Sequence, residues 1–139
     1  MSTLCSRVKK RIYSDAAKAG FPAERIWASF RVTQIYETGA AIYVYFSINH
    51  RGFARDKIVE LYEQIEDGAR DEVMLAGGSI SHHHGVGKIR KKFIDRSIPR
   101  LAIDWQKAIK DQIDPNNIFA INNTIPRSEE EREKIKTHF

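Results

Sequence analysis

The fold class is decided by the stretch AAIYVYFSIN, which occupies residues 40–49. It is rich in β-branched and aromatic residues, and these residue types favour strands. Successive side chains of a strand point to opposite faces. Every second residue from Ile42 to Ile48 therefore belongs to one apolar face, whereas Tyr43 and Tyr45 belong to the other. The stretch predicts a strand with one face towards a core and one polar face.

The neighbouring segments complete an α+β pattern. A second strand is predicted over residues 27–36, and a short turn makes residues 27–49 an antiparallel hairpin. Apolar residues recur at helical spacing over residues 5–19 and over residues 55–76, where Gly77-Gly78 supplies a stop. The order helix, strand, strand, helix predicts an α+β fold in which helices pack on an antiparallel sheet.

The last third of the chain is predicted to be mostly helical. Helices are expected over residues 88–95 and 99–113, with a turn over residues 114–119. From Arg127 onward the chain is charged and poor in apolar residues, so we expect it either to fray or to form a solvated helix.

Composition sets broad limits on the kind of protein. With 139 residues, of which 42% are hydrophobic, the chain can bury the core of one compact domain. One cysteine, Cys5, cannot form a disulfide framework and favours a reducing compartment. No apolar run approaches the roughly 20 residues that span a bilayer. Neither a secretory h-region nor a peroxisomal Ser-Lys-Leu ending is recognised, so a targeting signal is expected elsewhere or not at all.

The most unusual local feature is SHHHGVGK, residues 81–88. Two imidazoles on one side of an extended segment, His82 and His84, could hold zinc, but the sequence offers no second cluster at metal-ligand spacing, and we assign no metal site. A nucleotide-binding P-loop is also disfavoured, because His82 stands where its first glycine would be and Ile89 stands where its Ser or Thr would be.

An anion site is a better interpretation of the same segment. Gly85 and Gly87 allow a tight turn and close approach of the backbone to a ligand. Lys88 is expected to begin a helix, whose N-terminus favours anions. Imidazoles beside these groups suit a phosphate or a developing oxyanion. The alternative is a surface loop with chance histidines. The net charge of +5, which is densest over residues 88–92, fits an acidic small molecule, an anionic membrane surface or nucleic acid.

The segment also carries a family resemblance. GGSISHHHGVGK, residues 77–88, closely resembles a motif near the end of the alkyldihydroxyacetonephosphate synthases, flavin enzymes of the vanillyl-alcohol oxidase superfamily. Their oxidase cousins carry a shorter Ser-x-Glu-His-Gly-type pattern. The resemblance continues through FRVTQ (residues 30–34), IYVYF (42–46) and DPNNIF (114–119), and it covers roughly residues 5–124. Four blocks in the right order are far more specific than one.

The resemblance implies how the chain is organised. Residues 1–80 would be part of the cap, or substrate, domain, residues 81–126 the C-terminal active-site segment, and residues 127–139 a charged tail. The family's FAD-binding domain would precede this region and is absent from this chain. We therefore expect a fragment or truncated product that is inactive alone.

The resemblance also implies an activity. These enzymes exchange the acyl group of acyl-dihydroxyacetone phosphate for a long-chain fatty alcohol, and they use FAD without net redox change in ether-lipid (plasmalogen) biosynthesis. The implied partners are these two substrates and not nucleic acid. Peripheral membrane contact, a homodimer of the full-length protein and a peroxisomal location are further expectations.

Site residues follow from the matched motifs. The family's proton donor and acceptor is a tyrosine that falls on Tyr43, on the polar face of the predicted strand. A phenol needs cationic neighbours to act as a base at neutral pH. At the flavin-approaching C-terminal stretch, the synthase pattern Asn-Arg-Asn is replaced here by Ile121-Asn122-Asn123. The resemblance assigns catalysis to Tyr43, His82, His83 and His84, flavin contacts to His83, His84, Gly85, Asn122 and Asn123, and substrate binding to Arg31 and Lys88.

Two alternatives remain open. A fragment of a FAD-dependent 2-hydroxy-acid or phenol oxidase would share the fold, although the triple histidine and Tyr43 argue against it. A non-catalytic interaction or acidic-lipid-binding module would keep the fold without activity. An upstream reading frame that encodes a flavin domain would favour the enzyme.

Overall fold

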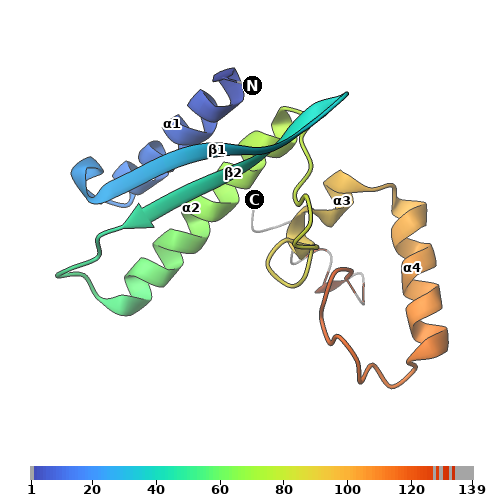
Figure 1. The fold of residues 1–139 in the computed structure, drawn as a ribbon. Helices are drawn as coiled ribbons and strands as arrows, with labels where there is room; N and C mark the ends of the chain where they lie inside the picture. The colour runs from blue at the N-terminus through green and yellow to red at the C-terminus, as the bar shows by residue number, and fades with distance from the viewer. Residues whose placement is uncertain (1, 127, 129, 132, 134–139) are drawn as a thin grey trace. The chain divides into compact units, whose positions relative to one another are not determined.

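The computed structural model describes residues 2–126, 128, 130, 131 and 133. The chain forms two compact units, one ending at Gly78 and the other beginning at Ser79. Helices α1 and α2 and strands β1 and β2 belong to the first unit, and helices α3 and α4 belong to the second (Figure 1).

The hairpin of the first unit is confirmed. Strand β1 (Ile26–Tyr36) pairs antiparallel with β2 (Gly39–Ile48), and each end lies within one residue of the prediction. The register runs from Ile26 opposite Ile48 to Tyr36 opposite Gly39. A β-bulge interrupts it between Val32 and Gln34.

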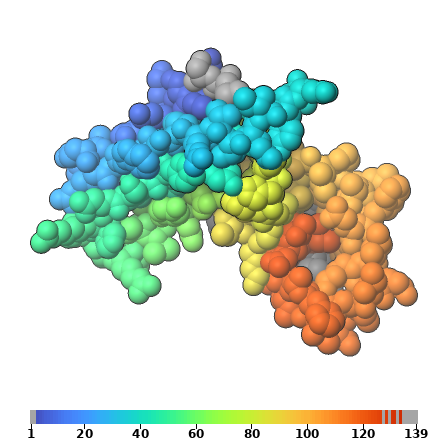
Figure 2. Space-filling model, viewed as in Figure 1, coloured from blue at the N-terminus to red at the C-terminus, as the bar shows by residue number. Residues whose placement is uncertain are grey.

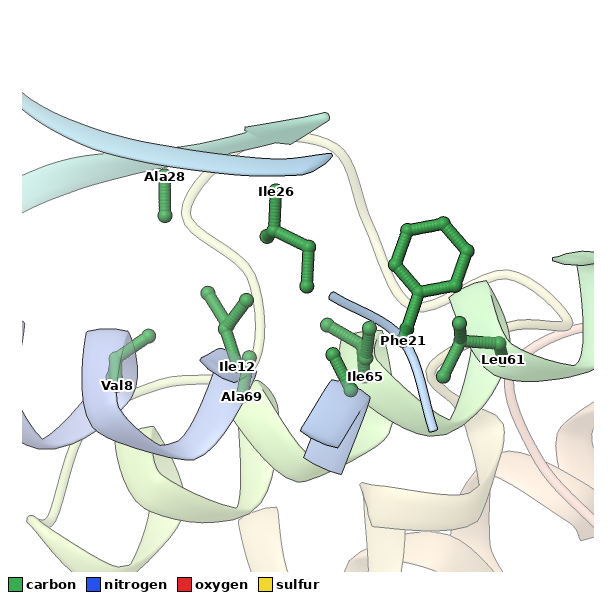
Figure 3. Packing of buried hydrophobic residues seen from close by; sticks show 9 residues of the cluster. Val8, Ile12, Phe21, Ile26, Ala28, Leu61, Ile65 and Ala69 are labelled. Atoms are coloured by element: carbon green, nitrogen blue, oxygen red, sulfur yellow. The ribbon is translucent and has the colours of Figure 1, made fainter. Parts of the chain in front are cut away.

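Two helices cover one face of this hairpin. Helix α1 (Ser2–Lys18) and helix α2 (Arg55–Leu75) agree closely with the predicted helices, and a 3-10 turn, η1 (Ala23–Arg25), leads into β1. Figure 3 shows Ile26 and Ala28 pointing from β1 towards the two helices. Burial of an isoleucine side chain contributes about 1.5–3 kcal/mol, so the alternating pattern of the strands is converted directly into core packing. The buried cluster consists of Val8, Ile12, Ala16, Phe21, Ile26, Ala28, Leu61, Ile65 and Ala69.

The predicted stop of α2 is also confirmed. Gly77 has a φ of +75°, a conformation that costs glycine little. The Gly78 N–H then donates to the Val73 carbonyl (2.9 Å), which satisfies an acceptor of the last helical turn.

The second unit is partly different from the prediction. Helix α4 (Arg100–Ile113) agrees with it, and the Pro99 carbonyl accepts from Ala102 N (3.0 Å) and Ile103 N (3.3 Å) as the helix begins. The expected helix over residues 88–95 is wrong over its first half. Residues 87–89 are a turn, followed by the 3-10 helix η2 (Lys91–Phe93) and the short helix α3 (Ile94–Ser97).

The reason for this difference lies in the glycine that precedes Lys88. Gly87 has a φ of +58°, which cannot continue into an α-helical start. The chain instead closes a turn in which Arg90 N donates to the Val86 carbonyl (3.2 Å). This unit has its own small core of Ile94, Ile103 and Ile125, on which Val86 and Ile98 pack. None of the helices in the described residues is long and apolar enough to cross a bilayer.

The charged tail is described only in part. Residues 127, 129, 132 and 134–139 of the predicted tail lie outside the described residues, whereas Glu130, Glu131 and Glu133 are helical. Glu131 is only partly exposed, and its carboxylate pairs with the buried amine of Lys91. The assignment of residues 1–80, 81–126 and 127–139 to functional parts of a larger enzyme stays a prediction.

Candidate functional site

The outer face of the hairpin carries the polar residues that the alternation predicted. Trp27, Ser29 and Arg31 of β1 lie opposite Ser47, Tyr45 and Tyr43 of β2, in that order. Since Ile26 and Ala28 face the helices (Figure 3), this set faces away from them. Trp27 is 57% exposed and Tyr43 is half-buried.

Arg31 and Tyr43 are therefore direct cross-strand partners. Residues in this relationship have Cβ atoms about 4.5–5.5 Å apart, which is within reach of two long side chains. The rings of Tyr43 and Tyr45 meet edge to face, with centroids 5.9 Å apart. Sequence reasoning placed both tyrosines on one face, but it did not foresee that Arg31 would pair with Tyr43.

The three histidines form one cluster of edge-to-face rings at the surface. The Nδ1 atoms of His82 and His83 share a hydrogen bond of 3.0 Å, so one ring must carry its proton on Nδ1 and the other must leave that nitrogen free to accept. The His83 and His84 ring centroids are 4.1 Å apart. The segment bends at these residues, and His83 contacts both neighbours, so the expected arrangement with His83 pointing away from His82 and His84 is wrong. Figure 2 shows the region around residues 80–90, in yellow, at the surface.

This clustering affects the protonation of the central ring. The pKa of His83 is lowered from its ordinary value of 6.5, first by desolvation and then by the charges of His84 and His82. A neutral imidazole that can both donate and accept a hydrogen bond is favoured in this position.

The backbone after the histidines is fixed at two glycines. Gly85 has a φ of +71° and Gly87 a φ of +58°, which confirms the predicted tight turns. The Arg90 guanidinium donates to the Gly85 carbonyl (3.3 Å), and Thr124 N donates to the Gly87 carbonyl (3.0 Å). Lys88 is exposed in a turn, so the expected helix N-terminus for an anion is wrong, and an anion would be held by side chains and loop amides.

The Thr124–Gly87 bond connects the histidine loop to the predicted flavin-approaching stretch. Ala120, Asn122 and Thr124 have left-handed φ values of 50°, 61° and 63°. Such conformations cost a non-glycine residue about 1–2 kcal/mol and persist where tertiary contacts hold them. The structure thus brings Asn122 and Asn123, both exposed, to the loop that contains Gly85. Tyr43 and Arg31 belong to the first unit, and the histidines belong to the second.

Two buried charges of the second unit were missed by sequence reasoning. Lys91 was grouped with a basic run that is usually solvated, yet it is only 5% exposed. Asp114 is equally buried, and its carboxylate accepts from Ile118 N and Phe119 N (both 2.9 Å) and from Lys110 Nζ. These bonds, led by that from Lys110, lower the pKa of Asp114 to about 2. The signal for Asp114 was available, since an aspartate before Pro115 is typical of a capped turn.

Metal coordination has no support among the residues that the structure describes. No group of three or more His, Cys, Asp or Glu side chains in this part of the chain is arranged to hold a metal ion.

Comparison with known proteins identifies the family. Residues 1–122 match the family described as FAD linked oxidases, C-terminal domain. The chain belongs to this family. The α+β arrangement of the two units agrees with the fold class expected for a FAD-linked oxidase C-terminal domain, and FAD is the cofactor that the family name implies.

Three relatives extend the comparison, and all are alkyldihydroxyacetonephosphate synthases. The Caenorhabditis elegans protein is 46% identical over 123 residues, which cover 88% of this chain and 20% of that protein. The Dictyostelium discoideum protein is 28% identical over 96% of this chain and 21% of its own length. The Trypanosoma brucei brucei protein is 22% identical over 95% of this chain and 21% of its own length. The resemblance noted in the sequence is confirmed, and the chain spans about a fifth of the length of these relatives.

Proposed function

We propose that this chain is the C-terminal part of an alkyldihydroxyacetonephosphate synthase. The complete enzyme would exchange the acyl group of acyl-dihydroxyacetone phosphate for a long-chain fatty alcohol in ether-lipid biosynthesis. The observation that carries the proposal is the histidine loop of a synthase-like chain, tied by the Thr124–Gly87 bond to the stretch that contains Asn122 and Asn123. Similarity to three synthases favours this function over a 2-hydroxy-acid or phenol oxidase.

The hairpin would supply the proton-transfer group. Tyr43 would donate and accept the proton at the substrate carbon, because it lies on the face of the hairpin that is turned away from α1 and α2. Arg31, its cross-strand partner, would place a permanent positive charge beside that phenol and beside the substrate anion. The two roles are compatible, since one guanidinium offers several donors.

The histidine loop would bind and orient the reacting groups. His82, His83 and His84 present ring nitrogens at the surface of one loop, and His83 is biased towards its neutral form. Neutral imidazoles can hold a developing oxyanion by donation without fixing a full charge there. Lys88 is exposed beside them and would contribute to binding of the phosphate.

The residues present fit one side of a flavin site. Gly85 has open space where a side chain would stand, and the exposed amides of Asn122 and Asn123 offer both donors and acceptors for a ring edge. When FAD is bound, it would supply the covalent trap that makes exchange possible without net redox change. The flavin pyrophosphate would be held by a domain outside this chain, so we expect the chain alone to be inactive.

The setting of the enzyme is also a proposal. By family resemblance, the full-length protein would act in the peroxisome as a homodimer with peripheral membrane contact. Its partners would be the two lipid substrates rather than nucleic acid.

The decisive experiment uses a full-length protein that carries this chain, in an alkyl-exchange assay with labelled fatty alcohol. Tyr43→Phe and His83→Ala are expected to lower kcat by about 100-fold or more, which is the typical contribution of a positioned acid–base group. Tyr45→Phe is the matched control, because Tyr45 shares the same face and strand. Normal exchange by both test variants would show that the catalytic assignment is wrong.

Binding of FAD by the isolated chain gives a separate check on the expected division of the site. A flavin fluorescence titration is expected to show no tight complex. Stoichiometric, tight binding would show that this chain holds more of the cofactor site than we propose.

A further inference from the structure

A buried lysine lies beneath the candidate site. Lys91 of η2 is only 5% exposed, and burial of a lysine is costly unless its charge is paired. Its Nζ donates to the carboxylate of Glu131 (2.5 Å) and to the backbone carbonyl of Asn122 (3.4 Å). These two partners come from segments 31 and 40 residues away along the chain. Lys91 therefore joins the segment around Glu131 to the Asn122 turn.

The turn over residues 122–124 connects Lys91 to the histidine loop. Two residues after Asn122, Thr124 N donates to the Gly87 carbonyl, and Ile125 is buried beside Ile94 and Ile103. Asn122 and Thr124 both have left-handed φ values, so this turn depends on the contacts that hold it. Hydrogen bonds join Glu131 to Lys91 and Lys91 to Asn122, the backbone continues from Asn122 to Thr124, and a further hydrogen bond joins Thr124 to Gly87.

We propose that Lys91 and Glu131 form an internal ionic latch that positions the Asn122–Thr124 turn against the Gly87 end of the histidine loop. Both are positioning residues, since neither is assigned to contact with substrate or cofactor. Only the consequence for catalysis rests on the proposed function. The latch itself is a property of the second unit.

The charge of Lys91 explains why Glu131 matters. Without the carboxylate, a buried ammonium group would retain the weaker Asn122 carbonyl contact, and solvation would draw the lysine outward. The Asn122 carbonyl would then lose its donor, and the Thr124–Gly87 bond would open more often. The expected change is local, because α4 keeps its own ion pairs, Arg100–Asp104 and Lys107–Asp111.

Hydrogen exchange of the full 139-residue chain tests the latch. Glu131→Gln is expected to speed exchange of the Thr124 amide by about 10-fold or more, since a hydrogen bond between charged groups is stronger than one between neutral groups. Glu130→Gln is the matched control, because it removes the same charge one residue away from the carboxylate that pairs with Lys91. The exchange rate of the Thr124 amide in this variant is expected to stay within about twofold of the parent. The latch would be overturned if the two variants changed exchange of the Thr124 amide equally. It would also be overturned if this amide exchanged fast in the parent and in both variants alike.

A double-mutant cycle makes the test specific to the pair. Lys91→Met removes the buried charge and keeps the side-chain volume, so Glu131→Gln in that background should add little. If each single substitution speeds exchange of the Thr124 amide about 10-fold, the double variant is also expected to exchange about 10-fold faster than the parent. Independent effects would instead multiply to about 100-fold. Multiplication would overturn the latch.

The kinetics of alkyl exchange by the full-length protein test the positioning role. Glu131→Gln is expected to lower kcat by about 10-fold with the KM for acyl-dihydroxyacetone phosphate nearly unchanged, because an interaction that only positions the site acts on the transition state. The positioning role would be overturned if Glu131→Gln speeded hydrogen exchange of the Thr124 amide but left kcat unchanged. A full-length protein without any exchange activity would refute the proposed function but leave the hydrogen-exchange result standing.

Discussion

Arg31 and Tyr43 lie directly opposite each other across the hairpin, on the face turned away from α1 and α2. This relationship gives the predicted catalytic tyrosine a cationic neighbour from its own sheet. It does not depend on how the two units of the chain are placed. We infer that the first unit carries a preformed half of the site.

Arg31→Met tests this pairing in the full-length enzyme. If Arg31 serves Tyr43, kcat is expected to fall about 10- to 100-fold with little change in KM, whereas a role only in substrate binding would raise KM. Arg25→Met is a suitable control, because Arg25 donates to the Arg51 carbonyl at the base of the hairpin. Identical kinetics of the Arg31 variant and the parent would contradict both roles.

His83 is expected to titrate below 6.5. Desolvation is the leading cause, so His84→Gln should return only part of the lowered pKa. The folded pKa lies below the unfolded one, and the stabilisation from a neutral His83 is therefore present above pH 6.5 and declines as the pH falls from that value through the folded pKa. NMR titration of the imidazole signals measures the pKa directly. A pKa of His83 at or above 6.5 would contradict the clustered arrangement of the three rings.

Asp114 is expected to control the acid stability of the second unit. Its pKa is lowered from 3.8 to about 2, so its contribution is fully present above pH 4 and is lost as the pH falls towards 2. Asp114→Asn should remove this pH dependence and lower stability at pH 7. Glu133→Gln is the control, because Glu133 is an exposed carboxylate of the same unit. Urea unfolding at pH 7, 4 and 2.5 measures the effect, and parallel pH profiles for Asp114→Asn and the parent would show that the prediction is wrong.

Gly68 allows the close approach of α1 and α2. A Cβ at this position would collide with the Asp15 carboxylate and would lie 2.9 Å from Arg11 Nε, and these two side chains form an ion pair. Gly68→Ala is expected to destabilise the first unit by up to about 1 kcal/mol, because the flexible ends of Asp15 and Arg11 must shift and their ion pair is weakened. In an Asp15→Ala background, Gly68→Ala should instead raise the free energy of unfolding by up to about 1 kcal/mol, because alanine is a better helix former than glycine. Urea denaturation of the four proteins measures both, and a stabilising Gly68→Ala in the parent would contradict the packing.

The hairpin could be predicted from sequence because its signal is local. A period-two pattern from Ile42 to Ile48 fixes both the strand and the face on which Tyr43 lies, whatever the rest of the chain does. The end of α2 was predictable for the same reason, since Gly77 determines its own backbone conformation.

The parts that sequence reasoning missed depend on distant residues. Lys91 sits in a run of basic residues that are usually exposed, and only Glu131, 40 positions later, explains its burial. The helix expected at Lys88 failed because Gly87 adopts a left-handed conformation that Thr124 holds from 37 residues away. The Arg31–Tyr43 pairing required an exact register, and strand boundaries read from sequence are too imprecise to supply it.

The bulge in β1 gives the hairpin tolerance to changes in loop length. Thr33 is the extra residue between the pairs Val32–Ile42 and Gln34–Ala41, and its hydroxyl donates to the Ala41 carbonyl (3.3 Å). Residues beyond it towards the tip follow a shifted register, while those before it keep the alternation that places Arg31 beside Tyr43. A change in loop length at the tip that the bulge absorbs would therefore leave Tyr43 on the same face of the sheet.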